Sequence, residues 1–195
     1  MSRHSIVTLS FDDLTVGNEW ISPRRTVTES DVVHFAGLSG DFNPIHVDHD
    51  DAARGPYGRP VAHGLLGLAI ASGLGSHAPK MDTLAFLAIL EWKFLQPIYF
   101  GDTIQVISRV LCLESRSRGR RGVVTWHREI VNQRGETVQE GKTQTLVRAR
   151  SAGDGATDTD LERADPVLPA EASPHEPRLE AHDRAPLPDP DRDPG

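Results

Sequence analysis

The sequence predicts an α+β fold in which a curved antiparallel β-sheet wraps around one central buried α-helix. The first observation is a run over residues 65–74, "LLGLAIASGL", in which every position is apolar or small. A helix with this sequence has no polar face, so it is expected to be buried on all sides. The second observation is that stretches rich in β-branched residues follow this run, separated by turn signals, as in successive antiparallel strands.

A shorter helix is predicted before the central one. It is expected to begin after Thr28, because Asp31 stands at the third following position, as in a capping box. Its apolar face would be formed by four residues: Val32, Val33, Phe35 and Ala36. Either Gly37 or Gly40 would end it. A second short helix or turn, rich in acidic residues, is expected near residues 48–55.

The strands are predicted from β-branched composition and from the turns between them. An early strand over residues 19–28 is interrupted by Pro23. The later strands are expected at residues 84–97, 102–115, 122–133 and 136–149. Alternation is clearest in the third of these, where Val124, Trp126 and Ile130 share one side. The basic segment "RSRGRRG", residues 116–122, is a turn candidate.

Charge and composition divide the chain into one domain and a tail. Residues 151–195 hold twelve Asp and Glu against four Arg, eight of the fourteen prolines and no aromatic residue. Such a segment cannot bury enough apolar surface to offset the entropy of ordering, so a disordered acidic tail is expected. Residues 1–150 hold sixteen acidic and seventeen basic residues, and they are expected to form one domain.

Several classes of protein are disfavoured by composition. No run reaches the roughly 18 apolar residues of a membrane span, and the first residues lack the apolar core of a signal peptide. The single cysteine, Cys112, excludes an internal disulfide and fits a reducing cytoplasm. The nearly neutral domain argues against nucleic acid as the main ligand.

The stretch "SGDFNPIH", residues 39–46, is the main candidate for chemistry. Asn and Pro are typical turn formers, while Asp41 and His46 are the side-chain types most used for proton transfer. The residues alone therefore allow either a turn or an acid–base pair on a stiff loop. The following run "HVDHDD", residues 46–51, could supply metal ligands, but acids that precede a short helix explain it more simply, and no metal is expected.

Three motifs together resemble the MaoC-like dehydratase and (R)-specific enoyl-CoA hydratase family. "GDFNPIH" (40–46) is similar to its hydratase motif, "VAHGLLGLAIASGL" (61–74) to the start of its helix, and "FLQPIYFGDTI" (94–104) to a later strand and turn. The resemblance covers about residues 15–148. It implies a hot-dog fold, hydration of an enoyl thioester in fatty acid metabolism, and an assembly of at least a homodimer.

The resemblance also implies roles for individual residues. Asp41 and His46 would contact the catalytic water, and the backbone N–H of Gly64 would stabilise the thioester oxygen. His63 would open the helix, and Ser72 matches a position near the active site, with a small packing residue as its alternative interpretation. Asn43 would hold the loop through its turn-forming side chain. No cofactor is implied, because coenzyme A or an acyl carrier would arrive as part of the substrate.

Two other functions stay open from the sequence. A hot-dog thioesterase would release free thiol from an acyl-CoA, and the "GDFNPIH" motif argues against it. The second function is that of a non-catalytic subunit that binds acyl thioesters. The presence of Asp41, His46 and Gly64 together argues against it, because such a subunit need not retain all three. The four arginines of residues 116–122 have two interpretations, a solvated hairpin tip or a contact with coenzyme A phosphates.

Overall fold

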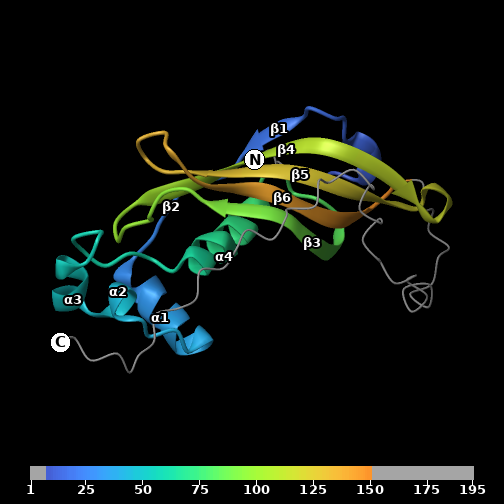
Figure 1. Ribbon diagram of the computed structural model, residues 1–195. Coiled ribbons are helices and arrows are strands. Elements are labelled where there is room, and N and C mark those ends of the chain that lie inside the picture. Colours follow the sequence, from blue (N-terminus) through green and yellow to red (C-terminus); the bar gives the residue numbers. More distant parts are fainter. Residues whose placement is uncertain (1–7, 151–195) are drawn as a thin grey trace, which may run out of the picture.

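Four long antiparallel strands form the body of the computed structural model, which describes residues 8–150 (Figure 1). These strands are β3 (Thr83–Phe94), β4 (Thr103–Arg116), β5 (Arg121–Val131) and β6 (Thr137–Arg148). The sheet order is β1-β4-β5-β6-β3, so β3 pairs with β6 and forms one edge among the described strands. The short β1 (Glu19–Ile21) and β2 (Arg25–Thr26) both pair with β4, as expected for an early strand that Pro23 interrupts.

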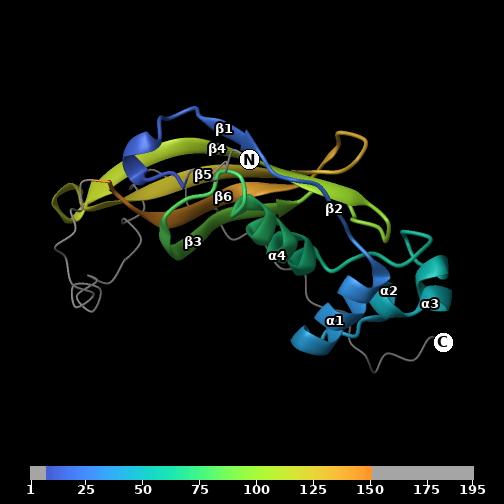
Figure 2. The ribbon, with the colours of Figure 1, turned by 180° about the vertical axis from the view of Figure 1, so that it is seen from behind.

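The sheet is curved, and the helix α4 (Gly64–Gly75) lies on its concave face (Figures 1 and 2). Register shifts recur along the pairing of β3 with β6, at positions where bulges bend a strand. Leu66 and Ile70 of α4 pack in one core cluster with Val106 and Ile130 of the sheet. The predicted α+β architecture of a curved sheet around one helix is confirmed.

The predicted burial of α4 on every side is wrong for the single chain. Leu66, Ile70 and Leu74 face the core, but Leu65 is 61% exposed and Ser72 is also exposed. The sheet covers only one side of α4. The edge strand β3 lines a groove with α4, and no described strand continues the sheet beyond β3. An apolar strip of α4 is therefore left without cover by the described residues.

The helix α1 (Glu29–Ser39) begins as the sequence predicts. The Thr28 side chain accepts from the Asp31 N–H while the Asp31 carboxylate accepts from the Thr28 N–H, which completes the capping box. The helix runs through Gly37 and ends at Gly40, whose φ of 77° is left-handed. Val33 is 53% exposed and does not belong to the buried face, so that part of the prediction is wrong.

Two further short helices follow α1 and lie beside it, beyond one end of the sheet (Figure 1). They are α2 (Pro44–Val47) and α3 (His49–Arg54). Short 3-10 turns occur at η1 (Phe11–Asp13) and η2 (Ser117–Gly119), the latter at the predicted basic hairpin tip. The first long strand ends at Phe94 rather than at Pro97.

The described residues include no helix that is both long and apolar enough to cross a membrane. The predicted disordered tail, residues 151–195, lies outside the described part of the chain.

Candidate active site

Asp41 lies in the segment that links α1 to α2, and His46 lies on α2 itself. Left-handed Gly40 turns the chain away from α1, and the Asp41 Oδ1 then accepts a hydrogen bond of 3.2 Å from the Asn43 N–H. Asn43 caps α2, since its Oδ1 accepts from the Ile45 N–H at 3.2 Å, and Pro44 occupies the first helical position. His46 therefore projects from a short helix, which the sequence analysis did not foresee within this stretch.

The His46 ring is held in one orientation by a backbone carbonyl. Its Nδ1 lies 2.7 Å from the carbonyl oxygen of Val61. A carbonyl can only accept, so Nδ1 carries the proton of this bond. In the neutral ring Nε2 is then the acceptor, and it faces the Asp41 carboxylate.

His63 occupies the position before the first residue of α4 and is only 3% exposed. Its Nε2 donates to the Asp41 backbone carbonyl at 2.9 Å, which ties the Asp41 segment to the start of α4. Its ring packs on the His46 ring with centroids 3.8 Å apart, and on Phe35 with centroids 5.0 Å apart. Its Nδ1 is buried with no hydrogen-bond partner among the described residues.

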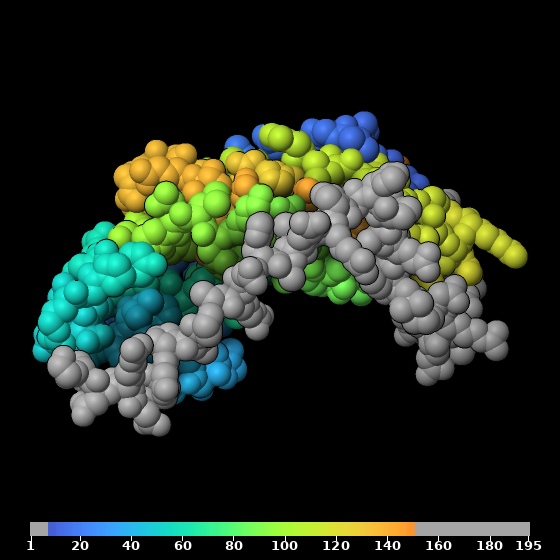
Figure 3. Space-filling model, viewed as in Figure 1, coloured from blue at the N-terminus to red at the C-terminus, as the bar shows by residue number. Residues whose placement is uncertain are grey.

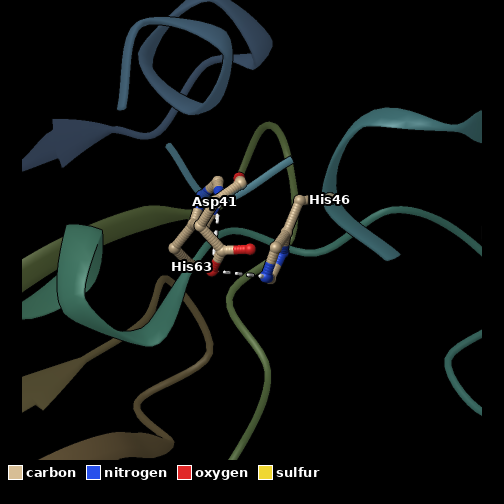
Figure 4. A group of neighbouring side chains, drawn as sticks. All are labelled: Asp41, His46 and His63. Carbon is tan, nitrogen blue, oxygen red and sulfur yellow. Dashed lines mark hydrogen bonds and ion pairs between the residues drawn. The ribbon is translucent and has the colours of Figure 1, made fainter. Parts of the chain in front are cut away.

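The Asp41 carboxylate approaches a nitrogen of each of the two packed imidazole rings (Figure 4). Its Oδ2 is 4.0 Å from the Nε2 of His46 and 4.0 Å from the Nε2 of His63. These separations are too long for direct hydrogen bonds and fit groups bridged by one small molecule such as water. The Asp41 side chain is 52% exposed, so its carboxylate is accessible from outside, whereas the two histidine side chains are largely buried.

These three side chains also offer ligand atoms within 4.8 Å of one another, a set that a transition metal could use. Metal binding, however, requires deprotonated nitrogen, and the Nε2 of His63 holds its proton against the Asp41 carbonyl. The neighbouring acidic run is used by the fold, because Asp48 caps α3 and His49 lies 2.9 Å from Glu29. The arrangement favours acid–base chemistry.

Gly64 is the first residue of α4, so its N–H has no partner within the helix and lies at the positive end of the helix dipole. A Cβ at this position would lie 2.9 Å from the Phe94 ring, so the close ring alone already favours glycine. The Gly64 carbonyl accepts from Gln139 Nε2 at 3.1 Å, and Gln139 Oε1 accepts from Trp92 Nε1 at 3.0 Å. Gln139, 2% exposed, thus fixes the start of α4.

One cavity lies beside His46 and the start of α4. It has a volume of about 430 Å³, and both His46 and Gly64 line it. Asp41 stands at its side through the 4.0 Å approach to His46 Nε2. Ser72 does not line it: eight residues after Gly64, it lies about 12 Å further along the helix. Gln139 was missed by the sequence analysis, because a glutamine within a strand carries no local signal of burial.

Comparison with known proteins finds one matching family model and relatives that are 32% and 38% identical. The MaoC like domain model matches residues 15–133. The (R)-specific enoyl-CoA hydratase of Rhodospirillum rubrum is 32% identical over 151 residues, which cover 77% of this chain and 99% of that protein. Protein MaoC of Klebsiella aerogenes is 38% identical over 102 residues, 52% of this chain but only 30% of that protein's length.

The fold also has a solved counterpart at low sequence identity. A conserved hypothetical protein of Mycobacterium tuberculosis, described as having a double hot-dog fold, superposes with a TM-score of 0.66 and 21% identity. The match covers 85% of this chain and 52% of that one. The curved sheet around α4 is therefore a hot-dog fold.

Proposed function

The chain belongs to the MaoC-like domain family, and on this premise we propose that it is a hydro-lyase acting on enoyl thioesters. It would reversibly add water to a trans-2-enoyl thioester of coenzyme A or an acyl carrier and form the (R)-3-hydroxyacyl thioester. The observation that carries the proposal is the 4.0 Å separation of Asp41 Oδ2 and His46 Nε2 beside a cavity that Gly64 also lines.

The two acceptors suit one water molecule. A carboxylate oxygen and a neutral imidazole nitrogen 4.0 Å apart can each accept one of its two O–H bonds. The water oxygen then presents a lone pair toward the substrate. During addition the oxygen bonds to the β-carbon as one O–H bond of the water breaks, its proton passes to Asp41 or His46, and the Asp41–His46 pair returns one proton to the α-carbon. Both residues are positioned for these transfers, in either order.

Negative charge develops on the thioester oxygen as the water adds. A backbone N–H at the start of a helix suits this charge, because it is already oriented and is supported by the helix dipole. The Gly64 N–H occupies that place in the proposed site. Gln139 and Trp92 hold the helix start, so the N–H would not need to reorganise during the reaction.

The test is a panel of trans-2-enoyl-CoA substrates of increasing chain length, followed through the absorbance of the conjugated thioester. We expect the absorbance to fall without release of free thiol, and the 3-hydroxyacyl product to be the (R) isomer. Release of thiol from saturated acyl-CoA would support the thioesterase alternative instead. Binding of acyl-CoA with neither reaction would indicate the non-catalytic subunit.

A homodimer is part of the proposal. Large apolar side chains of α4 and β3 stay exposed in the single chain, with Leu65 at 61%, Phe86 at 51% and Ile89 at 49%. A second copy would cover this face and the edge that β3 forms among the described strands. We expect light scattering at micromolar concentration to give at least twice the 21.4 kDa chain mass.

A matched pair of variants tests where the copies meet. Phe86→Asp should shift the mass toward the monomer, because it places a charge on the exposed face of α4 and β3. Val16→Asp, at a similarly exposed position (58%) before β1, should leave the mass unchanged. A monomer mass for the unaltered protein would contradict the dimer.

A further inference from the structure

Arg128 is a buried cation that has no counterion among the residues that the structure describes. It lies on β5 and is only 9% exposed. Its Nε has no hydrogen-bond partner among residues 8–150, and no ion pair to Arg128 occurs in that part of the chain. Burial lowers the pKa of its guanidinium to about 10, and no neighbouring acid opposes this effect. Buried charges are ordinarily paired, so this position calls for an anionic partner.

The guanidinium has a defined place beneath α4. A Cβ on Gly75 would lie 2.0 Å from Arg128 Nη1, so the guanidinium occupies the space that a side chain at this position of α4 would take. The Trp126 ring lies on its other flank, with the ring centroid 5.6 Å from the guanidinium carbon. Close by, the Thr143 hydroxyl is also buried without a partner in the described structure. Arg128 and Thr143, each with a buried polar atom that lacks a partner among the described residues, line the same cavity.

The hollow is part of a groove between α4 and β3. Two cavities of about 220 and 230 Å³ share Arg128, Ser72 and Phe86. The first also reaches Leu65, the residue next to Gly64. Figure 3 shows the concave underside of the molecule, where atoms of β3 are visible. The α4–β3 groove thus runs from Leu65, one residue after Gly64, to Arg128 beneath the end of α4, and it lies on the face that a second copy would cover.

We propose that Arg128, with Thr143, binds a carboxylate at the far end of the substrate's acyl chain, so that the substrates are ω-carboxy enoyl thioesters. This inference rests on the proposed function for the position of the thioester. A guanidinium matches the two oxygens of a carboxylate through paired hydrogen bonds, and the Thr143 hydroxyl can donate a further one. The walls between Gly64 and Arg128 are apolar, as a methylene chain requires: Leu65, Leu68, Ala69 and Ile89.

The length of the groove also determines which acyl chain lengths can reach Arg128. Gly75 is eleven residues after Gly64, a span of about 16 Å along the helix axis. A four-carbon acyl group held at Gly64 would not reach the guanidinium, whereas a medium-length chain would. The nucleotide end of coenzyme A does not fit here, because the hollow is about 230 Å³ and Arg128 is almost fully buried.

The test compares two enoyl-CoA substrates of equal medium chain length, one ending in a carboxylate and one in a methyl group. We expect the unaltered protein to favour the carboxylate by at least tenfold in kcat/KM. Arg128→Met, which keeps the side chain nearly as long, should lower kcat/KM on the carboxylate substrate by about 10- to 100-fold, the usual contribution of a hydrogen bond to a charged group. The same variant should not lower kcat/KM on the methyl-ended substrate. Arg148→Met, at an arginine paired with Asp82 on the surface, is the control and should change neither value.

A second measurement separates this inference from the proposed function. Binding of a free medium-chain dicarboxylate is measured by calorimetry on the unaltered protein and on Arg128→Met. If no enoyl thioester is hydrated but the dicarboxylate binds only to the unaltered protein, the hydratase proposal fails and the anion site stands. If Arg128→Met does not fold, the unaltered protein alone tests the anion site, through its preference between the two substrates and its binding of the dicarboxylate. Equal rates on both substrates together with no dicarboxylate binding would overturn the inference.

Arg128 could instead pair with an acid of a second copy. In that case Arg128→Met would weaken the dimer in light scattering and leave the substrate preference unchanged. That result would also overturn the proposal.

Discussion

Asp41→Asn and His46→Gln should each lower kcat on an enoyl-CoA by about 10²–10⁴-fold, the usual contribution of a positioned acid or base. Asparagine keeps an oxygen that can accept from the Asn43 N–H, and glutamine can still donate to the Val61 carbonyl, so the segment should keep its conformation. Each change removes one proton-transfer group beside the proposed water. Steady-state kinetics and thermal unfolding of each variant provide the check.

The double variant Asp41→Asn with His46→Gln gives a sharper result. Because both groups act on one transition state, its loss should be much smaller than the product of the two single losses. Asp50→Asn, on the exposed side of α3, is a matched control and should retain full activity. A folded Asp41→Asn protein with a near-normal hydration rate would contradict the catalytic interpretation.

Gly64→Pro should lower kcat by about 10²–10³-fold relative to Gly64→Ala, the usual cost of losing one oxyanion donor. Proline removes the N–H but is well tolerated at the first position of a helix. The preceding residue, His63, already has the extended backbone (φ −56°, ψ 136°) that a following proline requires. Both variants place a Cβ against the Phe94 ring, so the crowding of that ring is matched.

The comparison of proline with alanine isolates the N–H. Alanine retains the donor, so any loss that it causes measures crowding of Phe94 or of the substrate. Thermal unfolding should give similar melting temperatures for the two variants. If proline and alanine at this position lower kcat equally, the Gly64 N–H does not stabilise the thioester oxygen.

The order and type of the elements could be predicted because their signals are local. The Thr28–Asp31 capping box acts within four residues, and it marked the start of α1 correctly. The continuous apolar run likewise identified α4, and β-branched stretches identified the long strands. The end of α1 was left between Gly37 and Gly40, because either glycine permits a helix to end and only the left-handed turn toward Asp41 selects Gly40.

The candidate site was predictable in part. Asp41 and His46 lie five residues apart in one motif, so a local segment brings them together. The role of Gln139 depends on the pairing of β6 with β3, which brings it to Trp92 and Gly64 from a distant part of the sequence. The sequence analysis assigned Val124, Trp126 and Ile130 to one side of β5 but did not note that Arg128 shares that side.

By itself the sequence determined the architecture and the acid–base motif, because helix caps, apolar periodicity and short loops act between neighbouring residues. Only the tertiary structure decided which faces are covered and which polar groups find partners. It showed that one side of α4 is open in the single chain and that Arg128 is buried without an acceptor among the described residues. The physical reason is that burial and pairing depend on residues far apart in the chain, whose positions the packing of sheet and helix sets.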